Sequence, residues 1–291
     1  MLLLHDPRCA DYGSSMRPEQ PARVTRSVTH LRAAQPAWTW RVPDESLVTE
    51  EVLLMAHTPA HLKRLGEPRD FDADTPFFPG IGGHARRAVA AALDATRHAV
   101  EQRSPVFALM RPPGHHATST QGMGFCYLNQ IAIAALYARK QLGVARVAVW
   151  DFDAHHGNGT EAILHGSEGV LFASVHQHPG YPGTGTQDLG PQTRNWPIAP
   201  HTPRADHMAA LRESLDAVTA FAPNLILVSA GFDAYARDPI TSMTLERDDF
   251  ATLGCWLRET GRPAAALLEG GYHEDLPLLI EAFAGAWNKP A

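Results

Sequence analysis

Trp150-Asp-Phe-Asp-Ala-His-His-Gly-Asn-Gly159 is the stretch that decides the fold of this chain. It follows the run from Val144, which is β-prone, mostly apolar and predicts a buried strand. The strand ends in two aspartates and two histidines, and glycines then interrupt the chain. Open α/β sheets hold their ligands at the carboxyl ends of their strands. The pattern therefore indicates an α/β fold with a functional site at that edge.

Asp153 and His155 have the spacing of paired metal ligands. Residues two apart in an extended chain face the same side, so both can point at one ion, with Asp151 one step further in. Such a pair suits zinc only as part of a larger site, because a catalytic zinc usually has three protein ligands. A polar loop with chance histidines explains the pair equally well, so the rest of the chain has to decide.

The composition is that of an ordinary globular protein. The chain has 291 residues, of which 44% are hydrophobic and 19% charged. The net charge of −6 argues against a nucleic-acid binder and is compatible with a cationic substrate. No apolar run is long enough for a membrane helix, and the first residues lack the basic start of a signal peptide. The odd number of cysteines, three, is typical of reduced thiols, so we expect a cytoplasmic protein.

Predicted strands and helices alternate along the whole chain. The expected strands are 2–4, 38–42, 105–110, 144–150, 170–176, 224–229 and 264–268. The expected helices include 22–34, 49–57, 84–102, 128–142, 159–164, 204–221, 245–260 and 275–287. Long Gly/Pro loops are expected at 66–83, 111–124 and 179–191. This alternation predicts a parallel sheet with helices on both faces. We see no linker or repeat, so residues 1–291 should form one domain.

Four of these strands lead into polar residues of the kind that carry chemistry. They supply His115 and His116, the stretch after Trp150, Asp233, and Tyr272. In a parallel sheet all of them reach the same edge. Each group alone has a simpler explanation: a surface loop, a helix cap or a turn with a packed ring. Their shared position at the carboxyl ends of four strands favours one site.

The residue types suggest a division of roles. Asp153, His155 and Asp233 make three metal ligands and leave positions open for water and a substrate carbonyl. Tandem histidines in a rigid Pro-Pro-Gly loop suit a general base and acid, and each imidazole needs a partner to fix its tautomer. The available partners are Asp151 and Asn158, and the Tyr272 hydroxyl can stabilise an oxyanion.

Six motifs make the sequence resemble the zinc-dependent histone deacetylase family, which includes bacterial deacetylase-like amidohydrolases and acetylpolyamine amidohydrolases. They are Arg111-Pro-Pro-Gly-His-His-Ala117, Gly124-Phe-Cys-Tyr-Leu-Asn129, Asp151-Phe-Asp-Ala-His-His-Gly-Asn-Gly-Thr160, Ser229-Ala-Gly-Phe-Asp-Ala234, Asp238-Pro239 and Glu269-Gly-Gly-Tyr272. They stand in the family order over most of the chain. Asn158, where class I members usually have Asp, is closer to the class II branch.

The resemblance implies an arginase-like fold with about eight parallel strands and zinc on the three ligands above. It pairs His115 with Asp151 and His116 with Asn158. It implies an acyl channel and a potassium ion. The channel walls would be Gly124, Phe125 and Tyr181, with Ile240 at the mouth and Asp74 as a rim carboxylate. The potassium ligands would be Asp151, Ser174 and the backbone carbonyls of Asp153, His155 and Val175.

The resemblance also implies the reaction. We expect a metal-dependent amidase that removes acetyl or short acyl groups from acyl-lysine in a peptide or protein, or from an acetylated small amine. Ile240 offers no charge at the mouth, which favours the lysine stem over a long polyamine. An acetylpolyamine deacetylase is the alternative, since Asp72 and Asp74 could line the rim. A homo-oligomer is compatible with the sequence, because a dimer partner could narrow the mouth.

Two other readings are weaker. An arginase-type hydrolase needs a carboxylate just after His155 for a second metal, but His156 and Gly157 follow. A non-catalytic acyl-lysine binding module should lack Tyr272 or a histidine, and all are present. One departure from the family pattern concerns the first rim loop, where Arg17 stands at a position commonly held by His.

Overall fold

The structure, a computed structural model, describes residues 1–289 and is built on one parallel sheet. The strand order is β2-β1-β3-β8-β7-β4-β5-β6, and every pairing between neighbours is parallel. The strands are β1 (Leu2–Leu4), β2 (Thr39–Arg41), β3 (Val106–Ala108), β4 (Val147–Asp151), β5 (Val170–Gln177), β6 (Thr193–Ile198), β7 (Leu225–Ala230) and β8 (Ala264–Leu268). The predicted α/β fold with a central sheet of about eight parallel strands is confirmed.

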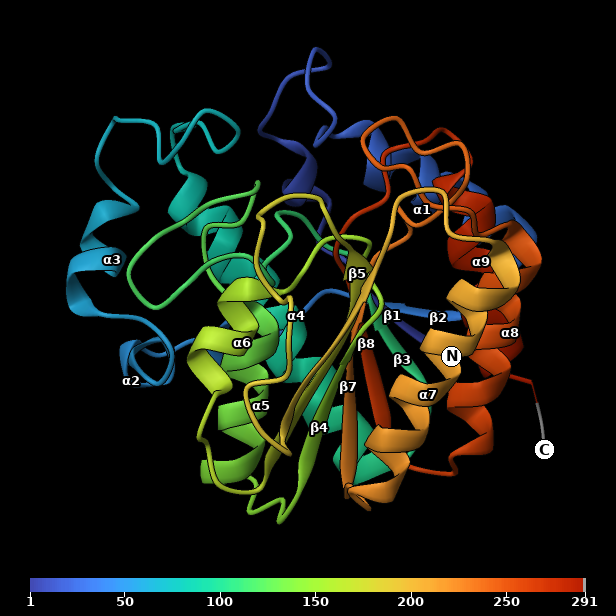
Figure 1. Cartoon of the computed structure of the whole chain (residues 1–291). Helices are drawn as coiled ribbons and strands as arrows, with labels where there is room; N and C mark the ends of the chain where they lie inside the picture. The colour runs from blue at the N-terminus through green and yellow to red at the C-terminus, as the bar shows by residue number, and fades with distance from the viewer. Residues whose placement is uncertain (290–291) are drawn as a thin grey trace.

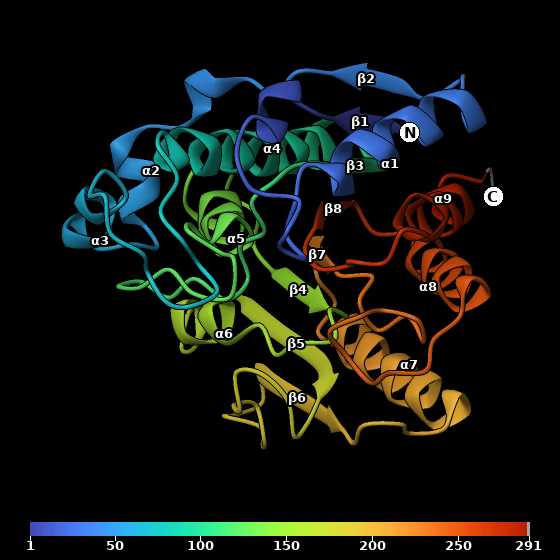
Figure 2. The same cartoon turned by 90° about the horizontal axis from the view of Figure 1, so that it is seen from above.

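Helices cover both faces of the sheet (Figures 1 and 2). One layer holds α2 (Glu50–Leu54), α3 (Pro59–Arg64), α4 (Ile81–Gln102), α5 (Gln130–Lys140) and α6 (Asn158–Leu164). The other holds α1 (Ala22–Ala34), α7 (Arg204–Ala220), α8 (Arg247–Glu259) and α9 (Leu276–Trp287). Two short 3-10 helices, η1 (Pro7–Ala10) and η2 (Glu45–Leu47), interrupt the first loops. None of the helices in the described residues is long and apolar enough to cross a membrane.

The central strand β4 is buried over its whole length. Its apolar residues pack on both faces, as expected for a strand between two helical layers. Trp150 is fully buried, and its Nε1 donates 2.9 Å to the Oγ of Ser214 on α7. Because β4 pairs in register with both β5 and β7, Asp151 lies beside Ser174 on one side and Ser229 on the other. The polar residues after β4 therefore leave the sheet between two neighbouring strand ends.

The helix predicted over 49–57 ends already at Leu54, and two larger differences from the sequence predictions concern a strand and a long helix. The edge strand β6 was not predicted, since Thr193-Arg-Asn-Trp-Pro-Ile198 is polar and contains a proline. Proline is tolerated on an edge strand, because its missing N–H faces away from the ladder. The long helix α4 begins at Ile81 and not at His84, so the preceding loop is shorter than predicted. The long loops lie over the carboxyl edge of the sheet, toward the top of Figure 1.

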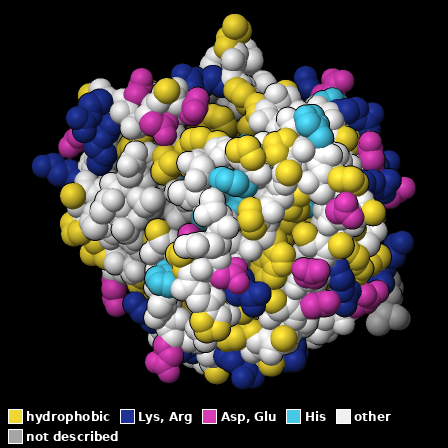
Figure 3. All heavy atoms as spheres, viewed as in Figure 1, with side chains coloured by type: hydrophobic (Ala, Val, Ile, Leu, Met, Phe, Trp, Pro, Cys, Tyr) yellow, Lys and Arg dark blue, Asp and Glu magenta, His cyan; other side chains and the backbone are white. Residues whose placement is uncertain are grey.

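On the face seen in Figure 3, acidic and basic side chains are interspersed around the edge and do not form one basic stripe.

Candidate active site

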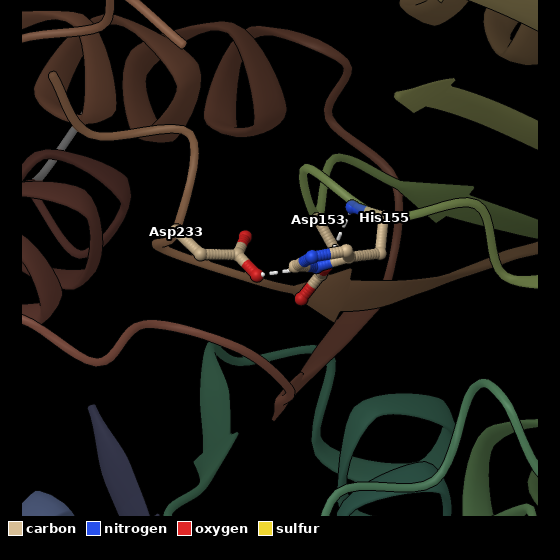
Figure 4. A group of neighbouring side chains, drawn as sticks. All are labelled: Asp153, His155 and Asp233. Carbon is tan, nitrogen blue, oxygen red and sulfur yellow. Dashed lines mark hydrogen bonds and ion pairs between the residues drawn. The ribbon is translucent and has the colours of Figure 1, made fainter. Parts of the chain in front are cut away.

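Three ligand atoms converge where β4 and β7 end. One carboxylate oxygen each of Asp153 and Asp233 and one imidazole nitrogen of His155 all lie within 4.8 Å of one another. Nδ1 of His155 is 2.8 Å from Oδ2 of Asp233 and 3.2 Å from Oδ1 of Asp153. Figure 4 shows the Asp233 carboxylate pointing at the His155 ring from a separate loop. The structure thus brings together the three residues predicted as metal ligands.

Backbone amides hold both carboxylates in place. Oδ2 of Asp153 accepts from the N–H of Gly270 at 2.7 Å, and Oδ1 of Asp233 accepts from the N–H of Ala154 at 2.8 Å. A Cβ on Gly270 would collide with both carboxylates, so only glycine permits this close approach. The ligand oxygens are therefore fixed by the ends of neighbouring strands.

The carboxylates buried at this edge favour a bound cation. The side chains of Asp151, Asp153, Asp233 and Glu269 are all fully buried. Burial, with the neighbouring Asp153 charge, raises the pKa of the Asp233 carboxyl. Burial also raises the pKa of Glu269, to about 7. Buried carboxylates are normally paired or coordinate metals, and this set of two carboxylates and one imidazole suits zinc or a similar divalent ion.

The tandem histidines lie beside this group with their rings 4.0 Å apart. Nδ1 of His115 is 3.0 Å from Oδ2 of Asp151, and Nδ1 of His116 is 2.8 Å from Oδ1 of Asn158. Because the Asn158 oxygen can only accept, Nδ1 of His116 carries the hydrogen and Nε2 is left free to take a proton. The structure therefore forms both predicted histidine pairs.

The two imidazoles have opposite pKa shifts. Burial lowers the pKa of His115, but the Asp151 and Asp153 carboxylates outweigh it and raise the pKa to about 10. Burial lowers the pKa of His116 well below its usual value, and the neighbouring His115 and His155 lower it further. One ring is thus stabilised as a cation and the other as a neutral base. Such a divergence between neighbouring groups is typical of acid–base sites.

Tyr272 lines the same cavity as His116 and His155. It follows Gly271, whose φ of +113° lies in the region that favours glycine. The buried Arg23 supports it from α1: its Nε donates 2.7 Å to the Gly271 carbonyl, and its guanidinium lies 4.7 Å from the Tyr272 ring centroid. Burial keeps the pKa of the Tyr272 hydroxyl well above its usual value, so it remains a protonated donor.

The cavity in front of these residues has a volume of about 260 Å³. It is lined by Arg17, Pro18, Asp74, His116, Gly124, Phe125, His155, Tyr181, Ile240 and Tyr272. All five residues predicted as channel or rim therefore border it. Phe125 holds a left-handed φ of +68°, and its N–H donates 3.0 Å to the Thr75 hydroxyl. The Tyr181 ring stands edge-on to His116, with centroids 5.1 Å apart.

The predicted potassium ligands also lie close in the fold. Asp151 on β4 is paired with Ser174 on β5, and the buried Val175 follows it. The N–H of Gln177 donates 2.8 Å to the Ala154 carbonyl, which holds the turn after β4 against β5. The potassium site itself stays a prediction.

Sequence reasoning gave no supporting role to three residues that hold the site in place, namely Arg23, Asp238 and Glu269. Oε2 of Glu269 accepts from the N–H groups of Gly114 at 2.7 Å and His115 at 3.2 Å. Oδ2 of Asp238 accepts from the N–H of Tyr272 at 2.7 Å. The position of Glu269 at the end of a strand, directly before Gly-Gly-Tyr, could have identified it. Nothing in the spacing of α1 distinguishes Arg23.

Comparison with known proteins points to one family. The histone deacetylase domain matches residues 17–285. A probable deacetylase from Methanothermobacter thermautotrophicus is 35% identical over 287 residues, covering 94% of this chain and 86% of that protein. A histone deacetylase-like amidohydrolase from Pseudomonas aeruginosa is 36% identical, covering 84% of this chain and 66% of that protein. The crystal structure of an acetylpolyamine aminohydrolase from Burkholderia pseudomallei superposes with a TM-score of 0.89 at 27% identity, over 99% of this chain and 98% of that one.

Proposed function

Because this chain belongs to the histone deacetylase family and is thereby a hydrolase of amide bonds, we propose that it depends on zinc and removes acetyl or other short acyl groups from acyl-lysine or a similar N-acyl alkylamine. The observation that carries this proposal is the convergence of three metal-ligand atoms within 4.8 Å beside the tandem histidines, at a cavity that His116 and Tyr272 line. The products are a carboxylate and a free amine. We further propose that residues 1–291 act as one catalytic domain.

The chain's own residues supply the proton transfers. Asp153, His155 and Asp233 would hold the zinc, which when bound polarises the amide carbonyl and lowers the pKa of the attacking water. Nε2 of His116, unprotonated at neutral pH, takes the proton of that water and later passes one to the leaving amine.

The remaining groups stabilise charge at the reacting atoms and on the buried carboxylates. His115, held by Asp151, places positive charge beside the reacting atoms. The Tyr272 hydroxyl donates to the carbonyl oxygen as negative charge develops on it. A potassium ion held by Asp151, Ser174 and the carbonyls of Asp153, His155 and Val175 would further offset the buried carboxylates.

A panel of substrates tests the proposal. Acetyl-, propionyl-, butyryl- and lactyl-lysine peptides are compared with acetylated putrescine, cadaverine and spermidine, and metal content is measured on the same preparation. We expect one divalent transition metal per chain and release of carboxylate from acyl-lysine. Two metals per chain would favour an arginase-type hydrolase. The structure gives no support to that outcome at His156, whose Nδ1 lies 2.7 Å from the Thr184 hydroxyl and which is outside the ligand group. No turnover of any substrate would favour a binding module.

An acetylpolyamine substrate is the second candidate, and the rim carboxylate of Asp74 favours it. Ile240, which is 36% exposed at the cavity mouth, provides the test. Ile240→Glu should raise kcat/KM for N8-acetylspermidine relative to an acyl-lysine peptide, because it adds a carboxylate where a second ammonium would lie. A wild-type kcat/KM at least tenfold higher for N8-acetylspermidine than for the best peptide would make the polyamine the better candidate.

A further inference from the structure

The mouth of the active-site cavity carries charges of both signs. Arg17 comes from the loop before α1, and Asp74 comes from the loop before α4. Both line the cavity, and Asp72 stands two residues from Asp74. A polyamine offers only positive charge to such a rim, and a peptide backbone offers none. The rim is thus not matched to either of these substrates alone.

Arg17 is held next to the acidic loop and is not neutralised by it. Its Nη1 donates 3.3 Å to the carbonyl of Ala73, the residue between the two aspartates. Within residues 1–289 neither Arg17 nor Asp74 forms an ion pair. Oδ1 of Asp72 accepts from the N–H of Asp74 at 2.9 Å, which fixes the turn. A cation and an anion from two neighbouring loops therefore line the mouth, each free to bind a charged group of a ligand.

The fold fixes the base of the Arg17 loop. Glu19 is buried two residues further on, and its Oε2 accepts from Nη2 of the buried Arg111 at 2.7 Å, with Nε donating to the other oxygen. Such a two-pronged pair sets both position and orientation. Because Arg111 opens the loop that carries the tandem histidines, the rim arginine is tied to the catalytic loop itself.

We propose that Arg17 and Asp74 select a zwitterionic substrate, free Nε-acyl-lysine or a close diamino acid analogue. This inference rests on the proposed function and names its substrate class. The α-carboxylate binds Arg17 and the α-ammonium binds Asp74, because both charges sit on one carbon and need partners that lie side by side. The methylene stem runs past Gly124 and Phe125 to the reacting amide. Water adds its oxygen to the acyl carbon, the C–N bond breaks, and the ε-nitrogen leaves with the proton from His116 to give the carboxylate and lysine.

Four acetamides with the same stem separate the two charges. Nε-acetyl-lysine carries both, N-acetylcadaverine only the ammonium, and 6-acetamidohexanoate only the carboxylate. Nε-acetyl-lysine with its α-amine acetylated and its carboxylate converted to a carboxamide carries neither charge and resembles a peptide. The zinc-loaded full chain is assayed by acetate release. We expect kcat/KM for Nε-acetyl-lysine to exceed that for each other compound by about fivefold, the effect of a half-exposed charge pair. The difference should appear in KM, because the rim lies away from the breaking bond.

Variants assign each charge to its partner. Arg17→Gln should lower kcat/KM for Nε-acetyl-lysine to the value for N-acetylcadaverine. It should also raise kcat/KM for N-acetylcadaverine through a lower KM, since a like charge is removed. Asp74→Asn, alone and with Asp72→Asn, should lower kcat/KM for Nε-acetyl-lysine to the value for 6-acetamidohexanoate. Arg69→Gln is the matched control. Its side chain is 74% exposed and does not line the cavity, so it should leave every ratio unchanged.

The outcomes distinguish this inference from the function on which it rests. Equal kcat/KM for all four compounds, or ratios that Arg17→Gln does not move, would overturn the zwitterion assignment and leave the amidohydrolase standing. A higher kcat/KM for the peptide-like compound would overturn it in favour of acyl-lysine within a chain. Absence of acetate release from all four compounds and from an acetyl-lysine peptide would overturn the proposed function as well.

Discussion

Nδ1 of His116 lies 2.8 Å from Oδ1 of Asn158, whereas the neighbouring His115 is bound to the carboxylate of Asp151. One imidazole therefore has a neutral partner and the other a charged one. A carboxylate stabilises the protonated ring, and an amide oxygen does so much less. The pKa values of these two adjacent histidines are thus shifted in opposite directions, although their sequence context is nearly the same.

His116→Ala should reduce activity more than His115→Ala does. His116 is the neutral ring that lines the cavity, so its loss removes the proposed proton-transfer group, and such a group typically contributes about 10²–10⁴-fold to the rate. His115 acts through charge, and its loss should be smaller. The two variants are compared by kcat, with bound metal measured in each as the control for an intact site. Equal losses, or a larger loss at His115, would reverse the two roles.

Asn158→Asp should move the pH dependence of kcat/KM. Burial and the neighbouring His115 and His155 hold the pKa of His116 below its usual value, so the ring stays unprotonated as the pH falls. A carboxylate at 158 stabilises the protonated ring and raises that pKa, by about one unit or more. Because the unprotonated ring is the proposed base, the acid limb should move to higher pH. Asn158→Ala, which adds no charge, is the control and should show no upward movement. An acid limb at the same pH in Asn158→Asp and wild type would mean that another group sets it.

Much of the fold could be predicted from sequence because its strands are short apolar runs that end in unusual polar residues. The stretch from Trp150 to Gly159 is the clearest example: it predicted both a buried strand and the edge where β7 and β8 deliver their own residues. Strand β6 could not be predicted in this way, since an edge strand needs neither an apolar face on both sides nor a complete set of N–H donors.

The residues that support the site were harder to predict than those that face the cavity. Arg23 is separated by 248 residues from the Gly271 carbonyl that it binds, and nothing local to α1 specifies that partner. Glu269 acts through its contacts to two backbone N–H groups of a loop on another strand. A sequence pattern shows residue types at one edge of a sheet, whereas these contacts depend on how distant loops pack together.

Tyr272→Phe should lower kcat while zinc content and substrate binding are kept. The phenol is half-buried and protonated, and Arg23 and the Asp238 carboxylate hold its ring and backbone in place, so the substitution removes only the hydroxyl. Loss of one oxyanion donor typically costs about 10²–10³-fold in rate. Steady-state kinetics with the best substrate give kcat and KM separately. A rise in KM at constant kcat would show that Tyr272 only shapes the channel.

Asp233→Asn should abolish metal binding and leave the fold intact. The asparagine oxygen can still accept from the N–H of Ala154, but the charge that faces His155 is lost. We expect zinc affinity to fall by more than about 100-fold, the upper cost of losing an outer partner of a metal ligand. Metal analysis after dialysis and circular dichroism measure the two effects. Asp216→Asn, whose side chain is 55% exposed on α7, is the matched control. Stoichiometric zinc with normal turnover in Asp233→Asn would remove Asp233 from the ligand set.

Acid should destabilise the fold through buried histidines remote from the metal group. Burial lowers the pKa of His207 on α7 to about 4, with the Asp249 carboxylate opposing the shift, and burial together with His61 lowers the pKa of His57 to about 3. Well above pH 6.5 these rings are neutral in both the folded and unfolded chain, so they add no pH dependence there. As the pH falls from about 6.5 toward 4, the unfolded chain takes up protons that the folded chain does not. Each histidine should then lower the free energy of unfolding by up to about 1.4 kcal/mol per pH unit.

His207→Gln isolates one of these contributions, because it removes the titrating ring and keeps a polar side chain in the helix. Urea unfolding of the zinc-loaded protein at pH 7.5, 6.5 and 5.5 gives the slope for wild type and variant. Protonation of metal ligands contributes equally to both proteins and cancels in the difference. His201→Asn is the control, since His201 is exposed and its φ of +60° is one that asparagine tolerates. The His207→Gln slope should be shallower than wild type by about one proton, and that of His201→Asn should match wild type. Parallel slopes for all three proteins would show that the folded chain protonates His207 as readily as the unfolded chain does.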